Sequence, residues 1–437
     1  MEIVIKICDA IGIMLTVLIA YQAIFAVIGV FKVKHFKKIE NKHKFAICIA
    51  ARNERNVIKN LLESIYNQNY PKDKLAVLVC PNNCTDDTAD IIRKYASEHL
   101  DLPIYVYERN CKEEKTKGFA LKYLFEQVKE NFEHGTEEFE GYFIFDADNV
   151  LASDYVTRMN EAFDAGEGEV NKIITSFRNS KNMHQNWISY GYAMHWMRTT
   201  LTENRAKAIL NQACRVQGTG FLFSNELVKD GWKYVTLTED RSFCTDAVIQ
   251  NYKITYVEDA KFYDEQPYSL KVAFKQRLRW SKGHLQSAVE NCPKLIKNMF
   301  SKNKNFFIQY DFFWLNFPFH IESVCRKIIK WTMQIIIAVL ASNFVGWLYA
   351  FFISYLIGLA TTWAGKLFVE MLVLIVYRKE INAIEKPKFW KSVFNILMFP
   401  FFDIIGKWTS YIALFKKIEW KPIPHDTVVD VSKLDNN

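Results

Sequence analysis

Short apolar segments alternate with amphipathic segments between residues 45 and 145, and this alternation constrains the fold more than any other feature. The amphipathic segment from Val57 to Ile65 repeats its apolar residues every three or four positions, which predicts a helix. Strands that alternate with helices form a parallel sheet with helices on both faces. The chain is therefore predicted to contain a doubly wound α/β domain. Its expected strands are Phe45 to Ala50, Leu75 to Cys80, Ile104 to Tyr107 and Tyr142 to Phe145.

Polar residues follow three of these strands, at the edge where ligands of open α/β sheets bind. The first strand leads to Arg52 and Glu54, the second to Asn82, and the fourth to Asp146 and Asp148. A pair of carboxylates at the end of a strand suits a hard divalent cation, because such ions prefer oxygen ligands. The sequence therefore predicts a binding site at this edge of the sheet.

An apolar run from Ile11 to Phe31 precedes the predicted sheet and has about the length that a bilayer requires. A cleaved signal peptide is the alternative, but the run is long and no small-residue cleavage site follows it. Basic residues come after the run, so the positive-inside rule places the N-terminus outside the cell and the next domain in the cytosol. These residues are Lys32, Lys34, Lys37, Lys38, Lys42 and Lys44.

Apolar segments also follow the predicted sheet. Phe306 to Phe319 is aromatic and suits a helix in the membrane interface, whereas Ile328 to Tyr349 and Phe351 to Tyr377 have the composition of two spans. Val393 to Phe415 is apolar but contains a proline and two charged residues. A third span there would place Lys416 outside the cell, against the positive-inside rule, so a re-entrant or interfacial element is expected.

These segments predict a multi-pass protein of the cell membrane with a cytoplasmic central domain. The expected parts are an N-terminal transmembrane helix over residues 1–31, a cytosolic α/β domain over 32–300, interfacial and transmembrane helices over 301–417, and a C-terminal tail over 418–437. A homo-oligomer or an accessory membrane partner is compatible with this arrangement.

Charge and cysteine content narrow the classes of partner. The net charge of +8 arises largely beside the apolar runs, which favours an anionic lipid surface. No nucleic-acid-binding motif occurs, so nucleic acid is not expected as a partner. The nine cysteines include no C-x-x-C pair and are expected to be buried small hydrophobes in a reducing compartment.

Four motifs occur in a fixed order along the predicted domain. They are Asp146-Ala147-Asp148, Gln217-Gly218-Thr219-Gly220-Phe221, Thr238-Glu239-Asp240 and Gln276-Arg277-Leu278-Arg279-Trp280. Each motif alone is a weak signal, since Asp-x-Asp is common by chance. In this order they closely resemble the membrane-bound family 2 glycosyltransferases, the group that includes cellulose, chitin, hyaluronan and poly-N-acetylglucosamine synthases. The resemblance covers roughly residues 45 to 290 and implies a catalytic domain of the GT-A type.

The resemblance implies a site for a nucleotide diphosphate sugar. Asp148, helped by Asp146, would hold Mg²⁺ or Mn²⁺ on the diphosphate of the donor, where the metal offsets the charge on the leaving group. The alternative for this pair is a strand-ending turn with solvated carboxylates. Arg52 and Glu54 would contact the nucleotide, although an ordinary surface pair is the alternative.

Cationic side chains would hold the diphosphate. The resemblance assigns this role to Lys117, in a loop that resembles a lysine-containing loop of the family, and to Arg279. Lys115 and Lys122 are alternatives to Lys117.

Asn82 is the one clear departure from the family pattern, because the family normally presents an Asp pair at this motif. An amide carbonyl can still accept the N3–H of uracil, so a UDP-linked donor is expected.

Asp240 is the predicted general base, because the hydroxyl of an acceptor must lose its proton as it attacks the anomeric carbon. Displacement in one step inverts that carbon, through a transition state with oxocarbenium character. Glu239 is expected to support Asp240. The alternative for both residues is a helix start capped by Thr238.

The acceptor is expected to contact two further motifs. Gly218, Thr219 and Gly220 resemble the loop beneath the acceptor, since glycines let sugar rings approach the backbone, although a plain tight turn is the alternative. Gln276 and Trp280 would close over the acceptor. An amphipathic interfacial helix anchored by Trp280 is the alternative, and the two roles are compatible.

The implied function is inverting transfer of a hexosyl or N-acetylhexosaminyl group to the end of a growing β-linked polysaccharide. The Gln-x-x-Arg-Trp motif favours repeated addition by analogy with the family. The small number of spans favours the main alternative, transfer of a single sugar to a lipid carrier or glycolipid. A membrane scaffold or sugar-binding protein with a decayed site is the non-enzymatic alternative, and only Asn82 favours it.

Overall fold

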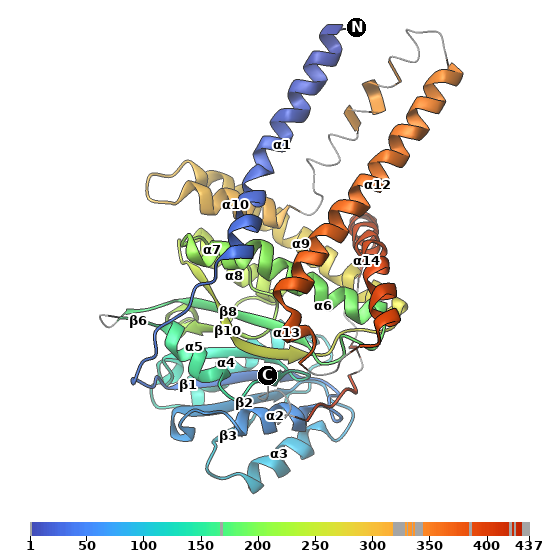
Figure 1. Ribbon diagram of the computed structural model, residues 1–437. Coiled ribbons are helices and arrows are strands. Elements are labelled where there is room, and N and C mark those ends of the chain that lie inside the picture. Colours follow the sequence, from blue (N-terminus) through green and yellow to red (C-terminus); the bar gives the residue numbers. More distant parts are fainter. Residues whose placement is uncertain are drawn as a thin grey trace.

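The computed structural model consists of an α/β domain from which two long helices, α1 (Glu2–Phe31) and α12 (Phe344–Val376), project in the same general direction (Figure 1). It describes residues 2–166, 169–317, 328–329, 331–333, 335–336, 344–383, 387–418, 422–423 and 425–430.

The N-terminal half of the domain is a parallel sheet. Its strands are β1 (Phe45–Ala51), β2 (Leu75–Pro81), β3 (Ile104–Val106) and β4 (Gly141–Asp146), in the spatial order β3-β2-β1-β4. Neighbouring strands are parallel throughout this half. The four predicted strands are therefore confirmed, and Asp146 lies at the carboxyl end of β4.

The second half makes the sheet mixed. Strand β9 (Phe221–Ser224) lies antiparallel to both β4 and β8 (Ile173–Ser180), while β10 (Ile254–Asp264) is parallel to β8 and antiparallel to β5 (Val150–Leu151). The full order is β3-β2-β1-β4-β9-β8-β10-β5. A separate hairpin pairs β6 (Asp164–Gly166) with β7 (Glu169–Val170).

Helices cover both faces of the sheet, which confirms the doubly wound class. On one face, β1, β2 and β4 share an apolar core with α2 (Ile58–Tyr66), α3 (Thr88–Glu98) and α5 (Tyr155–Phe163). The opposite core includes α4, α6 and α8. These three helices are Lys117–Asn131, Trp187–Thr199 and Glu239–Ile249.

Two helices connect the α/β domain to helix α1. Helix α9 (Leu270–Met299) packs against α8 and α10 (Phe306–Asn316). Helix α10 also contacts α1, because the hydroxyl of Tyr310 donates to the Leu18 carbonyl at 2.6 Å and that of Tyr21 donates to Asp311 at 2.9 Å. The smaller elements are α7 (Arg205–Ile209), α13 (Arg378–Ile381), a π-turn (Thr200–Asn204) and three 3₁₀ turns (Lys72–Lys74, Gly135–Glu137 and Asn225–Val228).

The C-terminal helices differ in part from the prediction. Helix α12 continues through residues 349–351, so the expected break between two spans there is wrong. Most of the first expected span, 328–349, lies outside the described residues. Within the described chain, two helices are long and apolar enough to cross a membrane, Phe351–Val376 and α14 (Phe389–Phe415).

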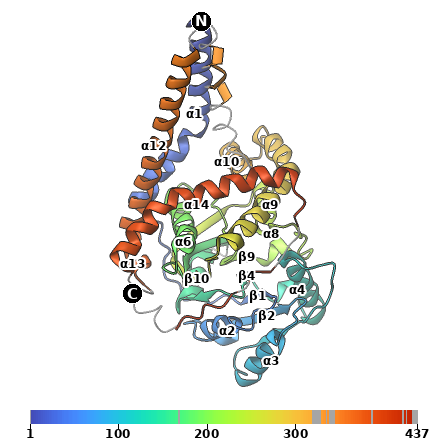
Figure 2. The same ribbon diagram turned by 90° about the vertical axis from the view of Figure 1, so that its right-hand side faces the viewer.

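Helix α14 lies across the domain at a steep angle to α12 (Figure 2). It packs against α6 and α9, and the Arg277 guanidinium of α9 donates to its Phe402 carbonyl at 2.7 Å. The interfacial placement of α14 and the predicted division of the chain into four parts remain predictions.

The start of α4 tests how tightly the domain is packed. A Cβ atom on Gly118 would lie 2.4 Å from the Tyr234 carbonyl oxygen and 2.8 Å from Val235 Cα. Gly118→Ala should therefore cost about 1–3 kcal/mol of stability, because backbone atoms cannot rotate away as a side chain can. The thermal unfolding midpoint in one detergent measures this loss. Gly358→Ala is the control, since nothing lies within 4 Å of the added methyl group. Equal midpoints for the two variants would contradict the prediction.

Candidate active site

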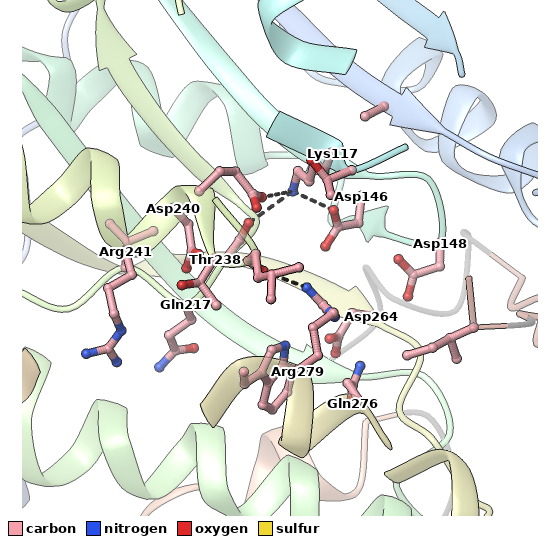
Figure 3. A pocket seen from close by; sticks show the side chains of 18 of the residues that line it. Lys117, Asp146, Asp148, Gln217, Thr238, Asp240, Arg241, Asp264, Gln276 and Arg279 are labelled. Atoms are coloured by element: carbon pink, nitrogen blue, oxygen red, sulfur yellow. Dashed lines mark hydrogen bonds and ion pairs between the residues drawn. The ribbon is translucent and has the colours of Figure 1, made fainter. Parts of the chain in front are cut away.

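A cavity of about 290 Å³ opens at the carboxyl ends of the parallel strands, and it gathers most of the predicted site residues (Figure 3). The predicted residues that line it are Arg52, Glu54, Asn82, Lys117, Asp146, Asp148, Gly218, Glu239, Asp240, Gln276, Arg279 and Trp280. Thr219 and Gly220 are not among the described residues that line the cavity.

Thr219 and Gly220 have packing roles behind the cavity. The Thr219 hydroxyl donates to Asn149 Oδ1 at 2.5 Å and accepts from the Asp146 backbone N–H at 2.9 Å, so it fixes the turn after β4. Gly220 has φ of +64°, and a Cβ there would lie 2.2 Å from the Phe262 ring. These constraints explain Thr219 and Gly220 without an acceptor.

Asp148 is held rigidly at the edge of the sheet. It is 5% exposed; Asn149 donates to its Oδ1 at 3.1 Å and the Glu265 backbone N–H donates to its Oδ2 at 2.8 Å. Burial raises the pKa of Asp148, but the positive charges of His425 and Lys181 outweigh it, and the pKa falls below its usual value. The carboxylate is therefore ionised and ready to bind a cation.

Lys117 connects the two acidic motifs. Its ammonium pairs with Asp146, donates to the Gly218 carbonyl at 3.1 Å and lies 3.9 Å from Glu239 Oε1 (Figure 3). Burial lowers the pKa of Lys117, but Asp146 and Glu239 raise it more, so the pKa is above its usual value. Lys115 also lines the cavity, whereas Lys122 pairs with Glu126 on α4.

Glu239 and Asp240 form the first turn of α8. Thr238 occupies the N-cap position, but its side chain makes no capping hydrogen bond, so capping does not account for the motif. Burial raises the pKa of Glu239, Lys117 lowers it and Asp240 raises it, with a net value of about 7. Gly218 approaches Asp240 closely, since a Cβ there would lie 3.6 Å from Asp240 Oδ2.

Helix α9 forms the wall of the cavity opposite the sheet. The Arg279 guanidinium donates to the Leu237 carbonyl at 2.9 Å, and burial lowers its pKa. The Trp280 ring packs edge-on against Tyr192 and Trp196, with ring centroids 5.9 and 5.7 Å apart. Trp280 thus belongs to an aromatic cluster inside the protein, next to the Gln276 and Arg279 side chains.

Asn82 is buried, and its amide is held by neighbouring groups. Its Nδ2 donates to the Glu114 carbonyl at 3.3 Å, and its Oδ1 accepts from Asn83 at 2.9 Å. A carbonyl oxygen has two lone pairs, so one remains for the N–H of a base.

The sequence analysis missed a part of the site that the C-terminal segment supplies. His425 lines the cavity and contacts Glu54, with Nδ1 3.0 Å from Oε2. The backbone N–H groups of Asp426 and Thr427 donate to the Glu265 carboxylate at 3.2 and 2.9 Å. The Asn60 side chain then donates to the Val429 carbonyl at 2.9 Å and accepts from the Val429 backbone N–H at 3.1 Å.

Carboxylates make the environment of His425 strongly negative. Burial lowers its pKa, but Asp148, Glu54 and Glu265 raise it, with a net value of about 10. The ring is therefore an imidazolium at neutral pH. A single histidine in an irregular tail carries no periodicity or spacing that would have predicted this position, since Glu54 lies 371 residues away in the chain.

The end of β10 supplies two further carboxylates that sequence reasoning missed. Asp264 and Glu265 line the cavity, and Asp264 forms a buried ion pair with Arg178. Burial raises the pKa of Asp264, and the Arg178 charge only partly offsets it. Arg178 also lies over the Trp196 ring, 4.1 Å from its centroid.

The residues around Asp148 fit a divalent cation. The described residues contain no group of three or more His, Cys, Asp or Glu side chains that is arranged to hold a metal ion. However, the carboxylates of Asp148 and Glu54 surround the His425 imidazolium, which shows that this point attracts positive charge. Carboxylate oxygens of this kind suit Mn²⁺ or Mg²⁺, whereas the protonated His425 ring has no lone pair to offer a metal.

Comparisons with known proteins agree with this geometry. Residues 43–283 match the family described as glycosyltransferase like family 2. A probable glycosyltransferase, YdaM of Bacillus subtilis (strain 168), is 24% identical over 86% of this chain and 83% of its own length. A beta-monoglucosyldiacylglycerol synthase of Nostoc sp. (strain PCC 7120 / SAG 25.82 / UTEX 2576) is 24% identical over 62% of this chain, which spans 56% of that relative.

A solved structure shares the fold. The mannosyltransferase PcManGT from Pyrobaculum calidifontis, in complex with GDP-Man and Mn²⁺, superposes with a TM-score of 0.58 at 17% identity, over 86% of this chain and 100% of that one. The predicted GT-A fold is thereby confirmed. Because the family match extends over more than half of the sequence, from before β1 into α9, this chain belongs to glycosyltransferase family 2.

Proposed function

We propose that the protein transfers a sugar, with inversion, from a nucleotide diphosphate sugar to a hydroxyl of an acceptor held at the membrane. The observation that carries this proposal is the cavity itself, which has Asp148 in one part and Asp240 in another, with Lys117 joining Asp146 to Glu239. One end suits a diphosphate with its cation, and the other suits a hydroxyl that must lose a proton.

The donor end would hold the diphosphate by charge. Lys117 and Arg279 both line the cavity and offer N–H donors to phosphate oxygens. Asn82 would face the base through the free lone pair of its carbonyl oxygen. That group accepts an N–H from uracil or from guanine, so both UDP-linked and GDP-linked donors are compatible with it. The GDP-Man in the related mannosyltransferase supports the second option, and the earlier expectation of UDP stays open.

A divalent cation would be held by Asp148, with Asp146, Glu54 and His425 nearby. When bound, the cation neutralises charge on the departing diphosphate. The Mn²⁺ in the related mannosyltransferase supports this assignment. The chain itself prepares the site by keeping Asp148 ionised, and the His425 imidazolium lies in the negative field that the cation would enter.

The acceptor end would deprotonate the attacking hydroxyl. Asp240 lies on the first turn of α8, beside the φ-positive Gly218 that lets an acceptor approach the backbone. Lys117 and Arg279 place positive charge near Glu239, the carboxylate next to Asp240. This positive charge partly offsets the repulsion between the two carboxylates. Attack from the side opposite the diphosphate inverts the anomeric carbon.

Two acceptors remain candidates. The Gln-x-x-Arg-Trp motif, with Trp280 in an aromatic cluster that can stack on sugar rings, supports extension of a β-linked glycan at the cytoplasmic membrane. A lipid carrier or glycolipid is favoured by the contact of α10 with α1, because α10 lines the cavity through Phe312 and Leu315. The synthase subtype within family 2 belongs to this proposal as well.

Asp240→Asn tests the proposed base. The variant should keep its affinity for UDP or GDP but lose transfer by about a hundredfold or more, because an amide cannot accept the proton. Nucleotide release from a panel of UDP-sugars and GDP-sugars measures transfer, and titration calorimetry measures affinity. Asp230→Asn, at an exposed residue, is the control. Turnover of Asp240→Asn near that of the wild type would remove Asp240 from the mechanism.

Glu239 generates a prediction about pH. Its folded-state pKa of about 7 exceeds the unfolded value of 4.5, so the native protein keeps a proton that the unfolded chain loses. The stability from this group is complete below pH 4.5 and should fall by about 1–3 kcal/mol as pH rises to 7. Glu239→Gln should remove this decrease, as measured by unfolding midpoints at both pH values. Glu126→Gln, at an exposed ion pair, should leave it intact, and an unchanged decrease in Glu239→Gln would refute the assignment.

Metal binding separates the roles of Asp148 and His425. Asp148→Asn should weaken Mn²⁺ binding in the presence of UDP or GDP by at least about tenfold, whereas His425→Gln removes a competing positive charge and should not weaken it. Electron paramagnetic resonance of free Mn²⁺ measures this affinity without a transfer assay. His134→Gln, at an exposed histidine, is the control. If His425→Gln binds Mn²⁺ much more weakly than the control does, the ring is a metal ligand and is not protonated in the complex.

A further inference from the structure

The cavity continues past Asp240, away from the donor end, into a region lined by basic and aromatic side chains. We call this region the basic compartment and define it by His195, Arg215, Arg241, His284, Phe312 and Leu315. In Figure 3 the Arg241 side chain points away from Asp148 and Lys117, on the side where Gln217 lies. The residues assigned to the donor and to the proton transfer do not use this compartment.

Arg241 directly follows the proposed base in α8, so the helix turns its guanidinium to a different side. Its Nη1 donates to the Leu315 carbonyl at 2.6 Å. Among the described residues, no carboxylate forms an ion pair with Arg241. Burial and the nearby Arg215 together lower the pKa of Arg241 to about 10. A half-buried guanidinium with no paired anion carries a desolvation cost, and a bound anion would relieve that cost.

Arg215 adds a second guanidinium to the same compartment. Its backbone N–H is fixed by Asn204 Oδ1 at 2.8 Å, and its Nη1 lies 3.6 Å from Glu203 Oε1. Glu203 also faces Lys207, 3.8 Å away, so it does not balance Arg215 alone. Lys207 pairs in turn with Asp311 at 2.7 Å. Among the described residues, Glu203 is thus the carboxylate that pairs with Arg215, and none pairs with Arg241.

The two histidines contribute neutral hydrogen-bonding groups. Burial, followed by the charges of Arg241 and Arg215, holds the pKa of His284 well below its ordinary value. Burial and Arg198 do the same for His195. A neutral imidazole can donate one N–H to an oxyanion, which is the chemistry that a tetrahedral anion between two arginines requires.

The remaining wall of the compartment is apolar and adjoins the predicted membrane helix. Phe312 and Leu315 belong to α10, whose Tyr310 is hydrogen-bonded to α1 and stacks against Phe307. Phe307 packs edge-on against Tyr21 of α1, with centroids 5.1 Å apart. An anion bound to the arginines would therefore have an apolar surface beside it, on the side of the membrane.

We propose that the basic compartment binds a phosphate group carried by a lipid, and that this lipid presents the acceptor hydroxyl to Asp240. This inference rests on the proposed function, because it names the acceptor class for the same site. The arginines pair with phosphate oxygens, and the apolar wall of α10 receives the first part of the lipid tail.

Binding of octyl phosphate to the purified full chain in a neutral maltoside detergent tests the proposal. UDP or GDP is present at saturation so that the donor site is filled. Octyl phosphate should bind saturably, and Arg241→Gln should weaken its affinity by at least about tenfold through loss of a charge-assisted hydrogen bond. Arg241→Lys keeps the charge and should lose less, which controls for the hydrogen bond to Leu315. Lys271→Gln removes the same charge from an exposed position and should bind like the wild type.

Four results would count against the proposal or against the function on which it rests. Binding of 1-O-octylglycerol as tight as that of octyl phosphate would overturn the proposal, because it carries no charge. Binding of inorganic phosphate as tight as that of octyl phosphate would overturn the assignment to a lipid. Equal affinities for Arg241→Gln and Lys271→Gln would remove the basic compartment from binding. If the wild type binds octyl phosphate but neither UDP nor GDP, the proposed function is wrong while the phosphate site stands.

Discussion

The contact of Lys117 with two acidic residues organises the catalytic half of the molecule. Asp146 ends β4 and Glu239 begins α8, and the ammonium of Lys117 lies within 4 Å of both carboxylates. Without that charge, the Asp146 and Glu239 carboxylates would face the same space without a counter-ion, and the buried Glu239 would bear the larger electrostatic cost. The tight seating of Gly118 against residues 234–235 sets the position of this lysine, so backbone packing and site electrostatics depend on each other.

The charge of the cavity changes sign along its length. Asp148, Glu54 and Glu265 surround an imidazolium near the sheet edge, whereas Arg215 and Arg241 share little compensation on the far side of Asp240. Such a charge gradient would distinguish two anionic ligands. A ligand in the acidic part must bind together with a cation, whereas a ligand beside the arginines needs none. Donor and acceptor would then be sorted by their phosphates as well as by their sugars.

The sequence predicted the parts of the fold that rest on local patterns. The four parallel strands and their polar ends follow from periodicity, and the strand ends and motifs together pointed to twelve of the residues that line the cavity. Strand β8 was missed because its sequence, IITSFRNS, places polar residues in a fully buried strand. His425 was missed because only the tertiary fold brings it to Glu54. The break expected near Tyr349 was wrong because an apolar run of that length continues as one helix.

The position of His425 has a consequence for biosynthesis. Glu54 leaves the ribosome early, while His425 follows α14 near the end of the described chain. The cluster of carboxylates therefore contacts the His425 ring only after α12 and α14 have been translated. The segment that follows α14 must also have bound Asn60 and Glu265. A nascent chain can fold its parallel strands well before that moment. The order of synthesis thus delays completion of the site until the apolar helices have been made.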